Sequence, residues 1–207
     1  GPNLFGVVPR SIIWMFMWPM VRDTGMRVVN QGKYLMGNVS GVKRYRQPHV
    51  QFHFLLDYVP DFKRAYSPGG LIQYQPFIPK ETAEDAFGAI LALCQRRGLP
   101  NYLTVLKRHK PDDFLLSYAV DGFSMAMDFR VTNGNRQRMM WLTQELDEIV
   151  LAAGGRFYFA KDSTLRPEVA RAYLGDERIA AFRALKRRCD PDNLLQTDLW
   201  RRVFPDK

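Results

Sequence analysis

The order of apolar and polar positions predicts alternating strands and helices after residue 70. Residues 71–78 are typical of a strand, with Gln73 and Gln75 on one of its faces. Pro76 indicates that this strand lies at an edge or contains a bulge. The same reasoning assigns, in chain order, a helix at 81–97, strands at 102–109, 114–120 and 123–131, a helix at 136–153 and an aromatic strand at 156–160.

The order strand, helix, strand, strand, helix, strand predicts an α+β fold, the split βαβ arrangement of a ferredoxin-like sandwich. Asp121 and Gly122 predict a tight hairpin between two of the strands. Helices need to cover only one face of such a sheet. In the long strand that follows, Ser124, Ala126 and Asp128 share the other face. That face is either solvated or one wall of a binding site for a polyhydroxy or anionic ligand.

Residues 1–68 show few clean periods, and no element is assigned there. The run 12–21 is strongly apolar, but Pro19 interrupts it and it has about half the ~20 residues needed to cross a bilayer. The run therefore predicts a buried helix, a surface that meets another part of a larger protein, or an interfacial contact with a membrane. No cleavable signal peptide is evident, so we expect a cytoplasmic chain, with membrane association as the alternative. The missing initiator Met leads us to expect that this is part of a longer gene product.

Charge and cysteine content narrow the classes of partner. Lys and Arg total 30 against 21 acidic residues, a formal charge of +9, which suits nucleic acid, anionic lipid or a phosphorylated substrate. The basic residues crowd the C-terminal fifth, but no RNA-binding or zinc signature accompanies them, so a solvated helix face or ion-pair surface is favoured over nucleic acid. Cys94 and Cys189 are far apart and belong to no CxxC motif, which predicts reduced thiols and no metal site.

The stretch GGRFYFAKDS, residues 154–163, carries the strongest candidate chemistry. Its aromatic strand ends in a Lys161-Asp162 pair just before a helix-like segment. The pair is either a surface ion pair or contains a functional lysine. In the second case Asp162 would hold Lys161 in place or pair with a neighbouring cation. The chain has no Walker loop, GxGxxG, nucleophile elbow or HExxH, so we do not expect a self-contained enzyme.

Five motifs in order carry a family resemblance: YSPGGLIQYQPFIP, LTVLKRH, GFSMAMDF, GGRFYFAKDS and LKRRCDPDNLLQTDLWRRV. Together they resemble the C-terminal half of FAD-linked oxidoreductases of the vanillyl-alcohol oxidase superfamily, over roughly residues 50–205. The resemblance implies that residues 1–155 are a substrate (cap) domain lacking its start. Residues 156–207 would be a helical segment that returns to complete the FAD-binding domain, most of which is absent. FAD would then be the cofactor of the complete protein and would not be retained by this chain.

The resemblance also implies roles for individual residues. The expected reaction is oxidation of a sugar-like or alcohol hydroxyl by hydride transfer to FAD. Lys161 would lie beside the flavin and the reacting sugar as the catalytic residue, and Tyr158 would lie near the flavin. Departures from the family occur at His109, Ser124 and Ala126. The substrate-binding residues implied are Gln73, Gln75, Lys107, His109, Ser124 and Ala126.

Two further expectations follow from this domain assignment. Surfaces that the missing FAD-binding domain would cover favour self-association of the chain. The alternative to an oxidoreductase is a ferredoxin-like binding module without chemistry, which recognises an anionic ligand or a protein partner through its open sheet face.

Overall fold

The computed structural model describes residues 3–4, 8–41, 44, 46, 48–49 and 60–204. The chain divides into two compact units. Unit 1 comprises Gly1–Leu71 with Arg130–Asn133, and unit 2 comprises Ile72–Phe129 with Gly134–Lys207. The proposed boundary between residues 155 and 156 concerns a larger protein and stays a prediction.

In unit 1 the apolar N-terminal run contacts the segment around Ser67. Trp18 Nε1 donates to the carbonyl oxygen of Ser67 at 2.8 Å, and the Arg22 guanidinium lies over the Trp18 ring. No residue of the helix formed by the run is buried, so the prediction of a buried helix is wrong. No helix in the described ranges has the length and apolar character that a bilayer span needs. The elements of this unit are β1 (Asn3–Leu4), β2 (Val8–Pro9), η1 (Arg10–Ile12), α1 (Ile13–Met17), α2 (Asp23–Ser40) and η3 (Phe62–Tyr66).

Helix α2 was not predicted from the sequence. It is 18 residues long and contains Gly25, Gly32 and Gly37. Each glycine costs a helix about 1 kcal/mol relative to alanine, which hides the helical pattern. The helix ends at Ser40, and the next residue, Gly41, has a φ of 59° that suits a residue without a side chain.

The main sheet is antiparallel and has five strands. Only Gln75 separates β3 from β4, and β5 pairs with β6 on the opposite side from β4. Across the sheet the order is therefore β5, β6, the broken strand β3/β4, and β7. Unit 2 and its sheet contain β3 (Gly70–Tyr74), β4 (Pro76–Pro79), α4 (Ala83–Arg96), β5 (Leu103–His109), β6 (Gly122–Val131), α5 (Arg136–Ala152), β7 (Arg156–Phe157), α6 (Pro167–Leu174), α7 (Asp176–Cys189) and α8 (Asp198–Val203).

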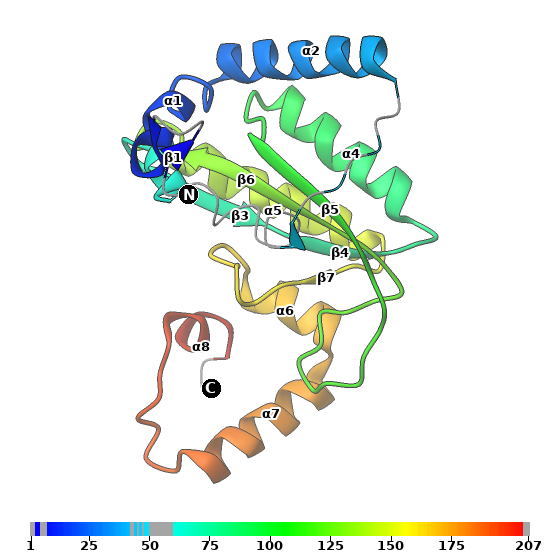
Figure 1. Ribbon diagram of the computed structural model, residues 1–207. Coiled ribbons are helices and arrows are strands. Elements are labelled where there is room, and N and C mark those ends of the chain that lie inside the picture. Colours follow the sequence, from blue (N-terminus) through cyan, green and yellow to red (C-terminus); the bar gives the residue numbers. More distant parts are fainter. Residues whose placement is uncertain are drawn as a thin grey trace. The chain divides into compact units, whose positions relative to one another are not determined.

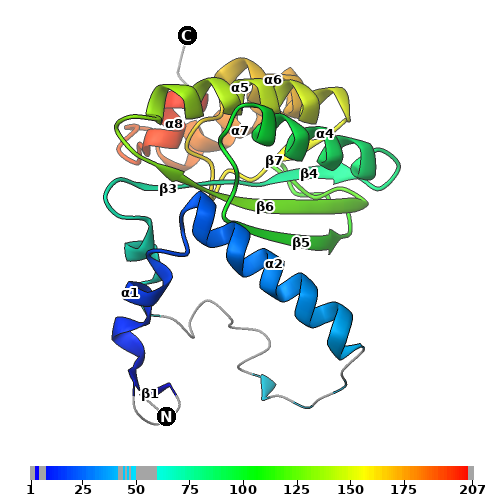
Figure 2. The same cartoon turned by 90° about the horizontal axis from the view of Figure 1, so that it is seen from above.

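Helices α4 and α5 contact each other and β4, and they lie on the same face of the sheet (Figure 2). Helices α6, α7 and α8 follow beyond the β7 edge (Figure 1). The predicted mixture of helices with an antiparallel sheet is confirmed. Because β4 pairs with both β6 and β7, Pro76 marks a break in a strand and the prediction of an edge strand is wrong.

The predicted strand 114–120 and its tight hairpin are also wrong. His109 of β5 lies opposite Gly122 of β6, so residues 110–121 form one loop between these paired strands. Backbone carbonyl groups of this loop bond to a side chain in place of a neighbouring strand. Arg156 Nη1 donates to the carbonyl oxygens of Ser117 and Ala119 at 3.4 and 3.1 Å.

Strand β7 is shorter than predicted, because Lys161 N donates to Tyr158 O at 3.1 Å and closes a turn directly after it. The predicted strand 156–160 therefore ends at Phe157. The two helices predicted at 81–97 and 136–153 are confirmed as α4 and α5.

The helix-covered face holds the core, and a carboxylate lies within it. Asp147 of α5 is 1% exposed. Its Oδ1 accepts a hydrogen bond from Tyr74 Oη at 2.9 Å, and Arg166 Nε lies 3.9 Å from its Oδ2. Burial raises the pKa of Asp147 to about 7, against the weaker opposing effects of Tyr74 and Arg166.

The buried Asp147 makes the free energy of unfolding fall as pH rises. The folded chain holds a proton on Asp147 at pH values where the unfolded chain has lost it, so stability is lost between about pH 4 and pH 7. The rise of the pKa from 3.8 to about 7 corresponds to about 4 kcal/mol. We expect Asp147→Asn to gain stability over the parent chain by this order between pH 4 and pH 8, measured by urea unfolding. A stability difference between Asp147→Asn and the parent chain that stays constant across this pH range would contradict the prediction.

Candidate functional site

The second face of β6 carries a row of buried polar and small side chains. Ser124, Ala126 and Asp128 are 0%, 4% and 2% exposed, so a solvated face is the wrong interpretation of this row. The register places Lys107 of β5 and Phe77 of β4 opposite Ser124, on the same face. The predicted alternation along β6 therefore brings polar groups of separate strands together.

Asp128 is the centre of one cluster on this face. Gln73 Nε2 donates to Asp128 Oδ1 at 2.5 Å. Burial raises the pKa of Asp128, while the Gln73 hydrogen bond and the charge of Lys161 favour the ionised form. Sequence reasoning placed Asp128 on the correct face but did not name it as a site residue. The signal available was an acid within a strand of otherwise small and apolar residues.

Lys161 lies in the turn after β7, close enough to this cluster for its charge to act on Asp128. Partial burial of its amine and the nearby charge of Lys107 lower the pKa of Lys161, and the charge of Asp128 opposes this. The two lysines and Asp128 therefore lie within electrostatic range of one another. Such an ammonium can stabilise negative charge that develops on a neighbouring group.

Asp162 does not pair with Lys161. Its Oδ1 accepts hydrogen bonds from Thr164 N and Leu165 N at 3.0 and 2.8 Å, and its Oδ2 pairs with the guanidinium of Arg202 in α8. Arg202 Nε also donates to Leu165 O at 3.1 Å. Of the two roles predicted for Asp162, pairing with a neighbouring cation is confirmed, and the pairing fixes the segment next to Lys161.

A second cluster lies closer to the 110–121 loop. Gln75 Nε2 donates to Ser124 Oγ at 3.2 Å, and His109 Nε2 lies 2.8 Å from the same Oγ. Gln75 Oε1 is buried and has no hydrogen-bond partner. Burial, together with the charges of Lys107 and Arg108, lowers the pKa of His109 below 6.5. Neutral imidazole is therefore the main form at neutral pH.

Aromatic rings border the second cluster. Phe77 is 1% exposed, and its ring lies 4.7 Å from that of His109 and 4.6 Å from that of Tyr118. Tyr158 packs on Tyr118, with their ring centroids 4.6 Å apart. Sequence reasoning missed Tyr118 because it assigned the loop to a strand. Ala126 adds only a methyl group to this face.

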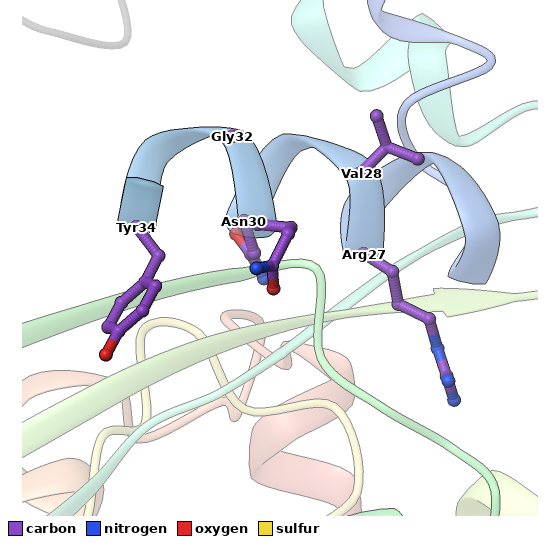
Figure 3. A pocket seen from close by; sticks show the side chains of 6 residues that line it. Arg27, Val28, Asn30, Gly32 and Tyr34 are labelled. Carbon is purple, nitrogen blue, oxygen red and sulfur yellow. The ribbon is translucent and has the colours of Figure 1, made fainter. Parts of the chain in front are cut away.

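Other features of the described residues offer no comparable site. One surface hollow is lined by α2 alone, where Arg27, Asn30 and Tyr34 point to the same side of the helix (Figure 3), and a single helix cannot enclose a ligand. No cluster of His, Cys, Asp and Glu in the described ranges could hold a metal ion. Both cysteines are free thiols.

The C-terminal basic helix is only partly a solvated face. Lys186 pairs with Asp190 and also donates to Asn193 Oδ1 at 3.1 Å. Asp190 in turn accepts from the backbone N–H groups of Leu194 and Leu195. Lys186 therefore helps to hold the α7–α8 connection, while Arg187 is exposed.

The chain is similar in sequence to known proteins. The chain is 34% identical over 166 residues to decaprenylphosphoryl-β-D-ribose oxidase of Mycolicibacterium smegmatis, covering 79% of this chain and 35% of that protein. It is 38% identical over 82 residues to an uncharacterised protein in the mprA 5′ region of Streptomyces coelicolor, covering 40% of this chain and 20% of that protein. No family model matches. The chain is a partial homologue of the oxidase, which supports the resemblance found in the sequence, and it spans about a third of that protein's length.

The proximity of Lys161 and Asp128 can be tested directly. We expect Lys161→Met to raise the pKa of Asp128, because the variant lacks the charge that favours the ionised carboxylate. Carboxyl 13C NMR titration measures the change. Lys80→Met is the matched control: it should raise the pKa of Asp121, to which Lys80 donates at 2.8 Å, and leave Asp128 unchanged. An unaltered Asp128 titration in Lys161→Met would separate the two groups and contradict the site.

Proposed function

We propose that this chain forms the substrate side of an FAD-dependent oxidoreductase that oxidises a hydroxyl of a sugar-like or alcohol substrate. The buried polar face of β6 carries the proposal, because Asp128 and Lys161 lie next to amide groups suited to hydroxyls. Its similarity to a protein named as an oxidase of decaprenylphosphoryl-β-D-ribose supports the reaction class.

The sheet order supports the ferredoxin-like assignment. The order is β5, β6, β3/β4, β7, and its two central strands, β6 and β3/β4, are those that begin the two halves of a split βαβ unit. Helices α4 and α5 cover one face of the sheet. In the proposed organisation residues 1–155 belong to the cap domain. Residues 156–207 return toward an FAD-binding domain, and the Asp162–Arg202 pair links the start of that segment to α8.

The residues beside Lys161 are of types that fit a flavin ring. Tyr118 and Tyr158 offer aromatic surface, and the Lys161 ammonium offers positive charge beside it. Bound FAD would supply the hydride acceptor. Lys161 would stabilise negative charge that develops on reduction, and Asp128 would favour its charged form.

The remaining groups of the face would bind and orient the substrate. Gln73, Gln75, His109 and Ser124 provide amide, imidazole and hydroxyl groups, and Lys107 provides a cation for a phosphoryl group. Lys107 also favours the second candidate, a binding module for an anionic ligand that has no chemistry, because it is an exposed cation beside buried polar groups.

The two candidates differ in their visible spectra. We expect the chain alone to purify colourless, because contacts to most of the cofactor, its diphosphate included, would come from the missing domain. Joined to the FAD-binding domain of a homologous oxidase, it should give a yellow protein that a short-chain analogue of polyprenylphosphoryl ribose bleaches under anaerobic conditions. Stoichiometric FAD in the isolated chain would refute the proposed domain organisation, and a yellow protein that no alcohol or sugar bleaches would favour the binding module.

Lys161 is the proposed catalytic residue of the joined protein. Loss of one preorganised electrostatic donor is worth about 3 kcal/mol, so Lys161→Ala should slow flavin reduction roughly a hundredfold. Lys161→Arg should restore little, because a planar guanidinium cannot replace a compact ammonium. Arg187→Ala, on the exposed part of α7, should reduce at the parent rate. Stopped-flow loss of flavin absorbance measures all three, and parent-like reduction by Lys161→Ala would remove Lys161 from the mechanism.

A further inference from the structure

The buried oxygen of Gln75 lacks a donor on the polar face of the sheet. Gln75 is 8% exposed, and its Oε1 has no hydrogen-bond partner. A buried carbonyl without a partner is unfavourable, and native proteins mostly avoid one. The oxygen therefore indicates a position where a ligand supplies the donor.

Ser124 and His109 fix which end of the Gln75 carboxamide is left unpaired. The Gln75 amide nitrogen donates to Ser124 Oγ at 3.2 Å, so the Ser124 hydroxyl is free to donate its own proton to His109 Nε2 at 2.8 Å. This order of donors requires a neutral imidazole that carries its proton on Nδ1. The Phe77 ring, 4.7 Å away, packs against the imidazole and restrains it.

We propose that the carboxamide oxygen of Gln75 accepts a hydrogen bond from a substrate hydroxyl, and that His109, acting through Ser124, is the positioning residue that holds the carboxamide in this orientation. The inference rests on the proposed function and specifies it: the group bound at this point is a hydroxyl that donates. A carbonyl at the same position has no proton to donate and leaves Gln75 unpaired, so the site discriminates between alcohol and carbonyl.

Protonation of His109 reverses the order of donors. A charged imidazole donates from Nε2 to Ser124, whose proton then turns toward Gln75 and favours a carboxamide rotated by half a turn. The site then presents an amide nitrogen in place of an acceptor. Because the pKa of His109 lies below its ordinary value, this change falls below pH 6.5.

Other charged and titratable groups lie around His109. Lys107 and Arg108 flank it on β5, and Arg108 pairs with Asp121, the residue just before β6. Tyr118 and Tyr158 pack on the far sides of Phe77. Hydrogen bonds from Lys80 and Arg108 lower the pKa of Asp121, away from the range in which His109 titrates.

The test measures binding separately from turnover. The protein is the chain joined to a flavin domain, and the probe is a short-chain polyprenylphosphoryl-β-D-ribose, a phosphodiester that does not titrate in this range. Calorimetry from pH 5 to pH 8 should show the parent protein weakening about tenfold in Kd toward pH 5, the size expected when the buried proton of the substrate hydroxyl loses its acceptor.

Two variants of His109 form the matched pair. His109→Gln supplies an amide oxygen that accepts from Ser124 and does not titrate, so its Kd should stay near the parent's pH 8 value down to pH 5. His109→Phe supplies no acceptor, so Ser124 turns toward Gln75 and Kd should be about tenfold weaker at every pH. Equal behaviour of the two variants overturns the proposal, as does a parent Kd that is independent of pH.

A second measurement examines the hydrogen-bond order without any ligand. Nitrogen-15 NMR of the 207-residue chain should place the His109 proton on Nδ1 at pH 8, and a proton on Nε2 overturns the proposal. Binding with the expected pH profile but without flavin reduction refutes the oxidase alone. Flavin reduction with pH-independent binding refutes the role of His109 alone, and absence of binding at every pH overturns both.

Discussion

Strand β6 is buried on both of its faces, and the arrangement of the polar site depends on this constraint. One row of its side chains is apolar and packs toward α4 and α5, while the other row includes Ser124 and Asp128. Polar groups removed from water need partners, since leaving one unpaired costs on the order of 1–3 kcal/mol. The neighbouring strand meets this need, with Gln75 bonded to Ser124 and Gln73 to Asp128. The residues of the broken strand are therefore coupled to the pattern of β6.

The turn after β7 depends on a contact from much later in the chain. Asp162 receives two backbone N–H groups and the guanidinium of Arg202, which lies 40 positions further on. These bonds hold the residues that follow Lys161, so the lysine projects from an anchored turn even though its own side chain is exposed. A charged group stabilises a neighbouring charge most effectively when its position is fixed in advance. Helix α8 thus contributes to the site without touching it.

The spacing of apolar residues predicted the helices and strands that bury one stripe or one row of side chains. It failed at the 110–121 loop, where side chains replace strand pairing, and at α2, where glycines weaken the helical pattern. The alternation along β6 and the stripe of α5 follow from burial of side chains at the period of a strand and of a helix. The loop around Ser117 looked like a strand because most of its residues are apolar, yet its carbonyls bond to Arg156, which no local pattern reveals. Asp128 and Asp147 were not recognised as buried acids, because sequence places a side chain on a face but does not show what covers it.

The site residues named from the sequence came from resemblance, and their connections came only from the structure. The resemblance identified position 124 as a departure from the family without indicating what a serine does there. A serine hydroxyl accepts and donates through one atom, so the state of His109 on one side reaches Gln75 on the other through a single oxygen. A primary amide separates its donor and its acceptor on different atoms and could serve both neighbours without coupling them. The hydroxyl at Ser124 therefore ties the orientation of Gln75 to His109.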